Sequence, residues 1–116
     1  MRRSGVVVAL AVVLLLPQSA GAKTLLAGHV GPGFTITLRN TGGRKVTKLT
    51  HGVYAVTVVD DSSIHDFHLK GPGVNKVITS VAFVGTKTVI VTLKAGRYVY
   101  LCDPHPSLMH GSFTVY

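Results

Sequence analysis

The chain has 116 residues, which is enough for one domain with its own hydrophobic core. The chain contains twelve Lys and Arg residues but only four acidic residues, all aspartates, which gives a formal net charge of +8. This excess of positive charge favours acidic partners, anionic cell-surface polymers or lipid headgroups. It does not favour nucleic acid, because no aromatic residues are interleaved with a clustered basic stripe. The charge could also serve solubility alone.

Residues 1–22 have the three parts of a secretory signal peptide. Arg2 and Arg3 form a basic start, residues 5–16 are apolar, and the segment ends in small side chains at Ala22. The apolar run is shorter than the roughly 20 residues that span a bilayer. We therefore predict cleavage after Ala22, export (secreted, periplasmic or cell-surface) and no membrane span in the mature protein. An uncleaved N-terminal anchor is the alternative.

Residues 23–116 would form the mature domain. Removal of Arg2 and Arg3 leaves ten basic residues against four aspartates, so its net charge would be +6. Apolar and β-branched residues alternate with polar ones, and Gly, Pro, Asn and Asp clusters interrupt the runs. This pattern predicts an all-β sandwich or barrel without a second domain. The expected strands are residues 25–30, 34–38, 51–60, 64–69, 77–84, 88–93, 97–102 and 112–116, with 44–49 as an edge strand or ordered loop.

The segment 64–69 decides where two histidines point. Successive side chains of a strand face opposite sides, so His65, Phe67 and Leu69 share one face and Asp66 and His68 share the other. Because Phe67 and Leu69 are the natural core pair, we expect His65 to point into the interior and His68 toward solvent.

A short segment near the C-terminus collects potential metal ligands. Cys102, His105 and Met109 have the spacing C-x-x-H-x-x-x-M, which lets a thiolate, an imidazole and a thioether converge from one tight loop. This ligand set suits copper that cycles between two oxidation states, and His65 is the candidate for a second imidazole. Otherwise the only cysteine of an exported chain would be a buried, inert side chain.

The same residues resemble the cupredoxins, the plastocyanin- and amicyanin-like family of blue-copper proteins. The resemblance rests on G-x-Y-x-Y-x-C-D-P-H over residues 96–105, on M-x-G-x-F-x-V over residues 109–115, and on His65-Asp66-Phe67 upstream. It covers residues 34–116. It implies a cupredoxin-like Greek-key β-sandwich of seven to eight strands, in which Tyr98 ties a loop to the sandwich through its hydroxyl.

The resemblance also implies one type 1 copper site. The metal would be bound by His65, Cys102 and His105, with Met109 as the long axial ligand. The protein would be an electron-transfer carrier and not an enzyme. It would be a monomer that meets a redox partner protein, which the basic charge suggests is acidic. An apolar rim of Pro104, Pro106 and Leu108 around His105 would be the docking patch.

The sequence departs from the family at two points. Three residues separate His105 from Met109, a loop length between those of the two named relatives, and this makes His110 a rival axial ligand. Asp66 stands where the family usually has asparagine. If Asp66 and Asp103 lie close together, their like charges should raise the pKa of one of them. Negative charge near the metal would also favour Cu(II) and lower the reduction potential.

Two other functions are compatible with the chain. A copper carrier or storage protein could use the same fold, although no Met-rich or His-rich tract is present. A metal-free β-sandwich could act in adhesion. No Ser/His/Asp arrangement or paired His-x-His motif points to an enzyme.

Overall fold

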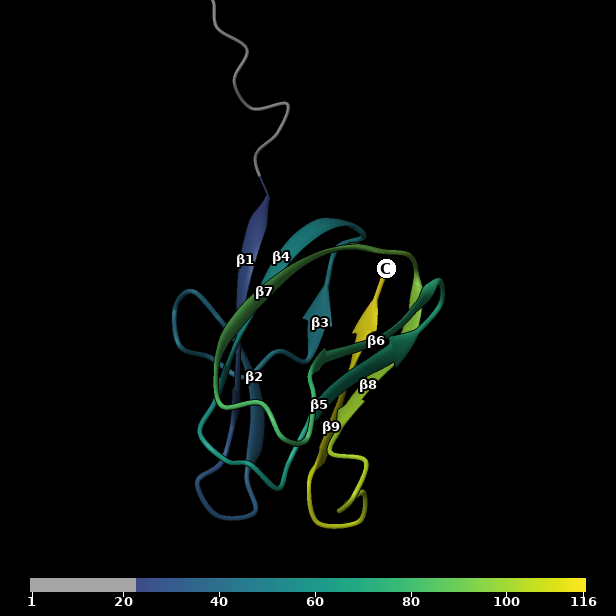
Figure 1. The fold of residues 1–116 in the computed structure, drawn as a ribbon. Coiled ribbons are helices and arrows are strands. Elements are labelled where there is room, and N and C mark those ends of the chain that lie inside the picture. Colours follow the sequence, from purple (N-terminus) through teal and green to yellow (C-terminus); the bar gives the residue numbers. More distant parts are fainter. Residues whose placement is uncertain (1–22) are drawn as a thin grey trace, which may run out of the picture.

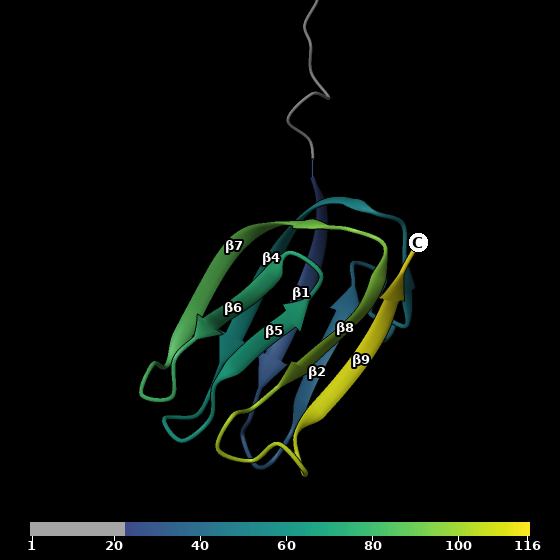
Figure 2. The same ribbon diagram turned by 90° about the vertical axis from the view of Figure 1, so that its right-hand side faces the viewer.

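The computed structural model describes residues 23–116, so the predicted signal peptide and its cleavage site lie outside the described residues. In this range nine β-strands form two sheets that pack face to face (Figures 1 and 2). The strands are β1 (Thr24–Val30), β2 (Ile36–Asn40), β3 (Lys48–Leu49), β4 (Gly52–Asp60), β5 (Phe67–Gly71), β6 (Val74–Thr79), β7 (Gly85–Leu93), β8 (Gly96–Leu101) and β9 (His110–Val115). The described range contains no helix that is long and apolar enough to cross a membrane.

The strand order is β2-β1-β4-β7 in one sheet and β3-β9-β8-β5-β6 in the other. The chain crosses between the sheets after β2, β3, β4, β6 and β7. The pairs β1–β4 and β3–β9 are parallel and the remaining pairs are antiparallel. The predicted all-β sandwich is confirmed. The two-residue strand β3, from the segment expected to be an edge strand or loop, brings the number of strands in the described range to nine.

Stacked aromatic side chains from the five-stranded sheet lie in the core among aliphatic residues of both sheets. The Phe67 and Tyr100 rings stack with centroids 5.6 Å apart, and the Tyr98 and Phe113 rings stack at 5.3 Å. All four side chains are buried. Stacking of this kind adds to the free energy gained from burying the rings. It gives the strands that lead to the C-terminal loop a rigid base.

Glycines allow these rings to lie flat against neighbouring strands. A Cβ on Gly111 would lie 2.3 Å from the Tyr100 ring, and one on Gly71 would lie 2.1 Å from the Tyr98 ring. The Tyr98 hydroxyl donates a hydrogen bond to the Pro72 carbonyl (2.7 Å) and accepts one from the Lys94 amide (2.9 Å). The structural role expected for this tyrosine is therefore confirmed.

Several predicted strands have different bounds in the structure, and two of the differences are large. The strand expected over residues 34–38 begins only at Ile36, which leaves Phe34 in the loop after β1. The strand expected over residues 77–84 instead runs from Val74 to Thr79, and the chain turns before β7 begins at Gly85. The loop that begins with the Gly-Pro-Gly triplet at residues 31–33 therefore continues through Phe34, although the alternation of residues 34–38 indicated a strand there.

Candidate metal centre

Loops at one end of the sandwich carry the predicted metal ligands. His65 lies between β4 and β5, and Cys102 and His105 lie between β8 and β9. The loop between β1 and β2 reaches the same end, which is at the bottom of Figure 1. Residues far apart in the sequence therefore meet where these loops approach one another. We call this end of the sandwich the metal pole.

Three of the predicted ligands converge on one point. The Cys102 Sγ lies 3.7 Å from the His65 Nδ1 and 3.6 Å from the His105 Nδ1, and the two Nδ1 atoms are 3.1 Å apart. The side chains of His65 and Cys102 are buried, whereas His105 is partly exposed. Among the described residues, these three form the only group of His, Cys and acidic side chains that could hold a metal ion.

The surroundings of His65 fix which of its nitrogens is free. Its Nε2 lies 2.8 Å from the carbonyl oxygen of Gly33. A carbonyl can only accept a hydrogen bond, so Nε2 must carry the proton and Nδ1 keeps its lone pair. That lone pair faces Cys102 and His105. A hydrogen bond of this kind on the outer nitrogen is how proteins orient a metal-binding imidazole.

Backbone hydrogen bonds close the loop that carries the other two residues. The Cys102 carbonyl accepts from the His105 amide (3.1 Å), and the His105 carbonyl accepts from the Met109 amide (2.9 Å). The Met109 carbonyl in turn accepts from the Cys102 amide (3.0 Å). Pro104 and Pro106 further restrict the backbone on either side of His105. The loop is thus held in shape by the protein itself.

Met109 and His110 differ in their surroundings. The Met109 side chain is fully buried. His110 is exposed, and its Nδ1 lies 2.9 Å from the Pro106 carbonyl oxygen. Burial places the thioether inside the molecule and the rival imidazole at the surface. This difference favours Met109 over His110 as a fourth ligand.

Asp66 is buried, although strand alternation puts it on the same face as His68. Only 3% of Asp66 is exposed, and its Oδ1 accepts a hydrogen bond from the Asp103 backbone amide at 2.6 Å. Strand β5 begins at Phe67, and its pairing with β6 shifts between Phe67 and His68. The two-residue alternation therefore does not extend back to Asp66.

His68 does point away from the core, as expected, but it is not free in solvent. Its Nδ1 lies 2.8 Å from Asp103 Oδ2, and its Nε2 lies 2.6 Å from Asn75 Oδ1. Its side chain is 14% exposed, against 46% for Asp103. A chain of polar contacts thus runs from buried Asp66 through Asp103 and His68 to Asn75 on β6.

The two aspartates have opposite pKa shifts. Burial raises the pKa of Asp66 to about 6, and its hydrogen bond with the Asp103 carboxyl adds to this rise. The pKa of Asp103 is lowered, first by the hydrogen bond from Asp66 and further by His68. The predicted rise at one member of the pair is confirmed, with burial as its largest cause. Of the two carboxyls, Asp66 is therefore the one that keeps its proton to the higher pH.

Burial also raises the pKa of the Cys102 thiol. The backbone amides of Asp66 and His105 act against this rise, because their N–H groups stabilise the thiolate. Without a positive charge beside it, the sulfur keeps its proton to higher pH than an ordinary cysteine. A bound cation would reverse this preference, since a coordinating thiol loses its proton.

Sequence reasoning missed the contribution of the loop between β1 and β2. The Phe34 ring meets His65 and His105 edge-on, with centroids 5.3 and 5.0 Å apart, and 53% of Phe34 is exposed. The Gly33 carbonyl orients His65. Phe34 was expected to be the first residue of a strand over residues 34–38. The Gly-Pro-Gly triplet directly before it was the signal that the loop continues.

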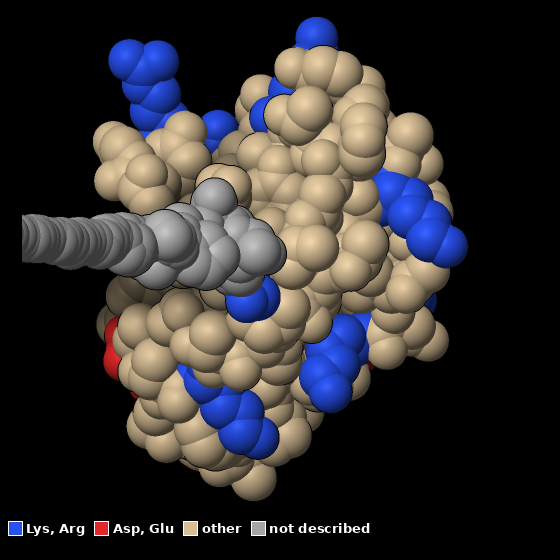
Figure 3. Space-filling view, turned by 90° about the horizontal axis from the view of Figure 1, so that it is seen from above, with Lys and Arg blue, Asp and Glu red and all other residues tan. Residues whose placement is uncertain are grey.

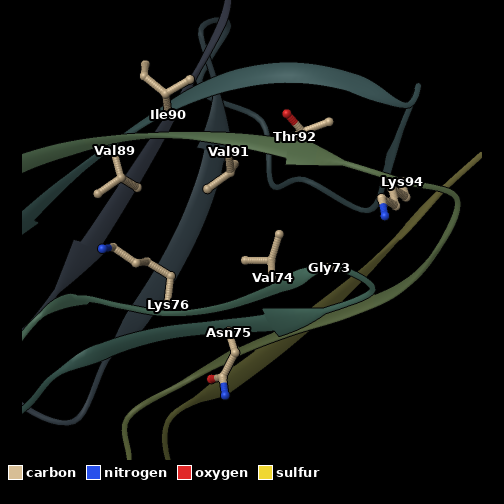
Figure 4. Close-up of a pocket in the computed structure, with 9 residues that line it drawn as sticks. All are labelled: Gly73, Val74, Asn75, Lys76, Val89, Ile90, Val91, Thr92 and Lys94. Carbon is tan, nitrogen blue, oxygen red and sulfur yellow. The ribbon is translucent and has the colours of Figure 1, made fainter.

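A groove in the described domain lies elsewhere. It has a volume of about 440 Å³ and separates the edge strands β6 and β7. Val74, Val89 and Val91 point into the groove and Ile90 points away from it (Figure 4). None of the converging residues lines this groove, so it is not part of the candidate metal centre.

Comparison with known proteins identifies the fold. No family model and no curated protein matches the chain. Solved structures of rusticyanin from Thiobacillus ferrooxidans (22% identity, TM-score 0.55) and of reduced rusticyanin (21%, 0.59) each match 84% of this chain, and 79% and 81% of their own chains. Auracyanin A, a blue copper protein from Chloroflexus aurantiacus, matches 82% of this chain over its full length (17%, 0.56). The chain has the cupredoxin fold.

Proposed function

We propose that this chain is an exported type 1 copper protein that acts as an electron-transfer carrier. His65, Cys102 and His105 would bind the metal, and Met109 would be the long axial ligand. The observation that carries the proposal is the convergence of one sulfur and two imidazole Nδ1 atoms within 3.7 Å of one another. The fold, shared with rusticyanin and auracyanin A, supports it.

The polypeptide holds the predicted ligands in fixed positions. His65 is fixed by the Gly33 carbonyl, and the loop from Cys102 to Met109 is closed by its own backbone hydrogen bonds. Copper, when bound, supplies a one-electron couple. Ligands that the protein holds in one geometry acceptable to both oxidation states need little rearrangement when an electron arrives or leaves.

The exposed edge of His105 supports a site for electron exit. Pro104, Pro106 and Leu108 around it are exposed, Leu108 by 66%, and the ring of Phe34 extends this apolar surface. A small apolar patch allows the brief, weak docking that redox partners require. The redox partner would meet the protein here.

The direct test is to titrate the exported, metal-free protein with Cu(II). We expect one equivalent to produce an intense visible thiolate-to-copper charge-transfer band, and we expect Cys102→Ala to abolish it. His110→Ala is the matched control and should keep the band, because His110 is exposed. Reversible voltammetry with fast electron exchange would then separate an electron carrier from a copper carrier or storage protein. Absence of the band in the wild-type protein would overturn the proposal.

A further inference from the structure

The acidic side chains of the described domain gather at one end, and four of its ten basic side chains lie at the other. All four acidic residues of the chain lie at the metal pole. Asp60 and Asp61 follow one another where β4 ends beside the last residue of β1, and Asp66 and Asp103 are the neighbours of His65 and Cys102. The ion pairs that these aspartates form are with His29 and His68.

The opposite end, which we call the basic pole, is defined by Lys23, Lys48, Lys94 and Arg97. Lys23 directly precedes β1, Lys94 directly follows β7, and Arg97 is the second residue of β8. Lys48 in β3 pairs with Thr114 near the end of β9. Figure 3 looks onto this pole: basic side chains surround it, and acidic atoms appear only at its edge.

Exposed apolar side chains accompany these basic residues. Leu25 and Val53, near the beginnings of β1 and β4, are 54% and 43% exposed. The C-terminal residue Tyr116 is 61% exposed, and the Lys48 Nζ lies 5.8 Å from the centre of its ring. Lysine beside aliphatic and tyrosine side chains is the composition of protein surfaces that lie at a membrane–water interface.

We infer that the basic pole is a docking surface for a membrane that contains anionic lipid. Negatively charged headgroups attract the end with Lys48, Lys94 and Arg97 and repel the end with the aspartates, so the charge division orients the domain. An acidic polymer would satisfy the charges but would leave Leu25, Val53 and Tyr116 in water.

The membrane docking is inferred independently of the proposed function, but it decides which end of the domain a redox partner can reach. A domain held by its basic pole presents the metal pole, with the exposed edge of His105, away from the lipid surface. The positive charge of the chain is then directed at the membrane. The redox partner, which approaches the end that carries the aspartates, need not be acidic.

The test measures binding of the protein, as recovered after export and without metal, to vesicles. Vesicles of phosphatidylcholine with 30% phosphatidylglycerol are compared with pure phosphatidylcholine. Each Lys or Arg near an anionic surface strengthens binding about fivefold. The variant Lys48→Gln/Lys94→Gln/Arg97→Gln should therefore bind the anionic vesicles about 100-fold more weakly. Lys45→Gln/Lys76→Gln/Lys87→Gln loses the same net charge outside the basic pole and should bind within about threefold of the wild type.

A second measurement reports the orientation. The chain contains no tryptophan, so Tyr116→Trp and Val84→Trp each add a single fluorophore, the first at the basic pole and the second just before β7 begins at the other end. Only the Tyr116→Trp emission should shift to the blue on anionic vesicles. Circular dichroism confirms that each variant folds.

Three results would overturn the inference. They are equal binding to neutral and anionic vesicles, equal weakening by the two triple variants, and a Tyr116→Trp emission that does not move. Binding of a soluble polyanion as tightly as the vesicles, without that shift, would assign the pole to an acidic polymer instead. Loss of copper binding would leave all of these measurements interpretable, because they use the metal-free protein.

Discussion

Asp66 and Asp103 are joined by a 2.6 Å hydrogen bond from the Asp103 backbone amide to the Asp66 Oδ1. The bond links the segment that carries His65 to the loop that carries Cys102. The sandwich thereby fixes the position of the loop relative to the histidine. It does so with a buried carboxyl whose pKa is raised to about 6, so the same contact has a cost in stability when Asp66 is ionised.

The first prediction concerns the stability of the metal-free protein. Because the pKa of Asp66 is higher in the folded state, the folded protein holds this proton more tightly. The contribution of Asp66 is therefore most favourable below about pH 4 and is lost as the pH rises toward 6. Asp66→Asn should raise the free energy of unfolding at pH 7.5 by about 1 to 3 kcal/mol, because its amide can still accept from Asp103 without a buried charge.

Chemical denaturation at pH 4.5 and at pH 7.5 measures how much Asp66→Asn changes the free energy of unfolding. Asp103 contributes in the opposite direction, since its pKa is lowered, and its share is lost as the pH falls. The comparison is therefore made between wild type and Asp66→Asn at each pH and not across pH in one protein. An advantage of the variant that is as large at pH 4.5 as at pH 7.5 would contradict the assignment.

The second prediction concerns the reduction potential of the copper-loaded protein. An ionised Asp66 next to His65 stabilises the more positive oxidation state, so removing its charge should raise the potential. For a charge interaction of about 1 to 2 kcal/mol, the rise in Asp66→Asn is about 40 to 90 mV at pH 7.5. Voltammetry measures it. An unchanged potential would show that the charge of Asp66 does not reach the metal.

The site illustrates what the sequence could reveal. His65, Cys102, His105 and Met109 were predicted as ligands because each is a rare side chain at a distinctive spacing, and the structure brings the first three together. His65 is buried as expected, although it precedes β5 and the alternation used to place it does not extend to it. The two-sheet fold followed from the same alternation.

Other parts of the site depend on loop conformation, which alternation does not describe. Burial of Asp66 results from a register shift at the start of β5, and the contacts of Phe34 and Gly33 result from a long loop after β1. Even the loop from Cys102 to Met109 is closed by backbone hydrogen bonds that do not depend on side-chain type. A one-dimensional pattern contains no information about which backbone groups meet across two loops.

The third prediction is that copper binding depends on pH through Cys102. Burial raises the pKa of this thiol, so the proton must be displaced when the metal binds. The apparent affinity for copper should increase up to about tenfold per pH unit across the range where the thiol is protonated. Competition with a chelator at several pH values measures the slope. Cys102→Ser is the control and should show a smaller slope.

The fourth prediction separates stability from redox tuning. Tyr98→Phe removes the hydroxyl that bonds the Pro72 carbonyl and the Lys94 amide, far from the metal pole. The loss of two partly buried hydrogen bonds should lower the free energy of unfolding by about 1 to 3 kcal/mol. The potential should stay within measurement error. A shifted potential would mean that Tyr98 also positions the metal-binding loop.

The fifth prediction concerns Phe34. Its exposed ring contacts both imidazoles edge-on, which would place it between them and solvent. Phe34→Ala should open this side and speed the transfer of copper to an external chelator about tenfold, whereas Phe34→Leu should restore most of the protection. Stopped-flow absorption of the copper band gives both rates. Equal rates in all three proteins would show that the ring does not shield the site.

The central claim is that one sulfur and two imidazoles from distant parts of the chain bind the same copper ion. X-ray absorption of the copper-loaded protein tests it most directly, because it reports the atoms bound to the metal. We predict one short copper–sulfur bond and two imidazole nitrogens, with the short sulfur contribution missing in Cys102→Ala. A copper ion surrounded only by nitrogen and oxygen in the wild-type protein, as in that variant, would contradict the account.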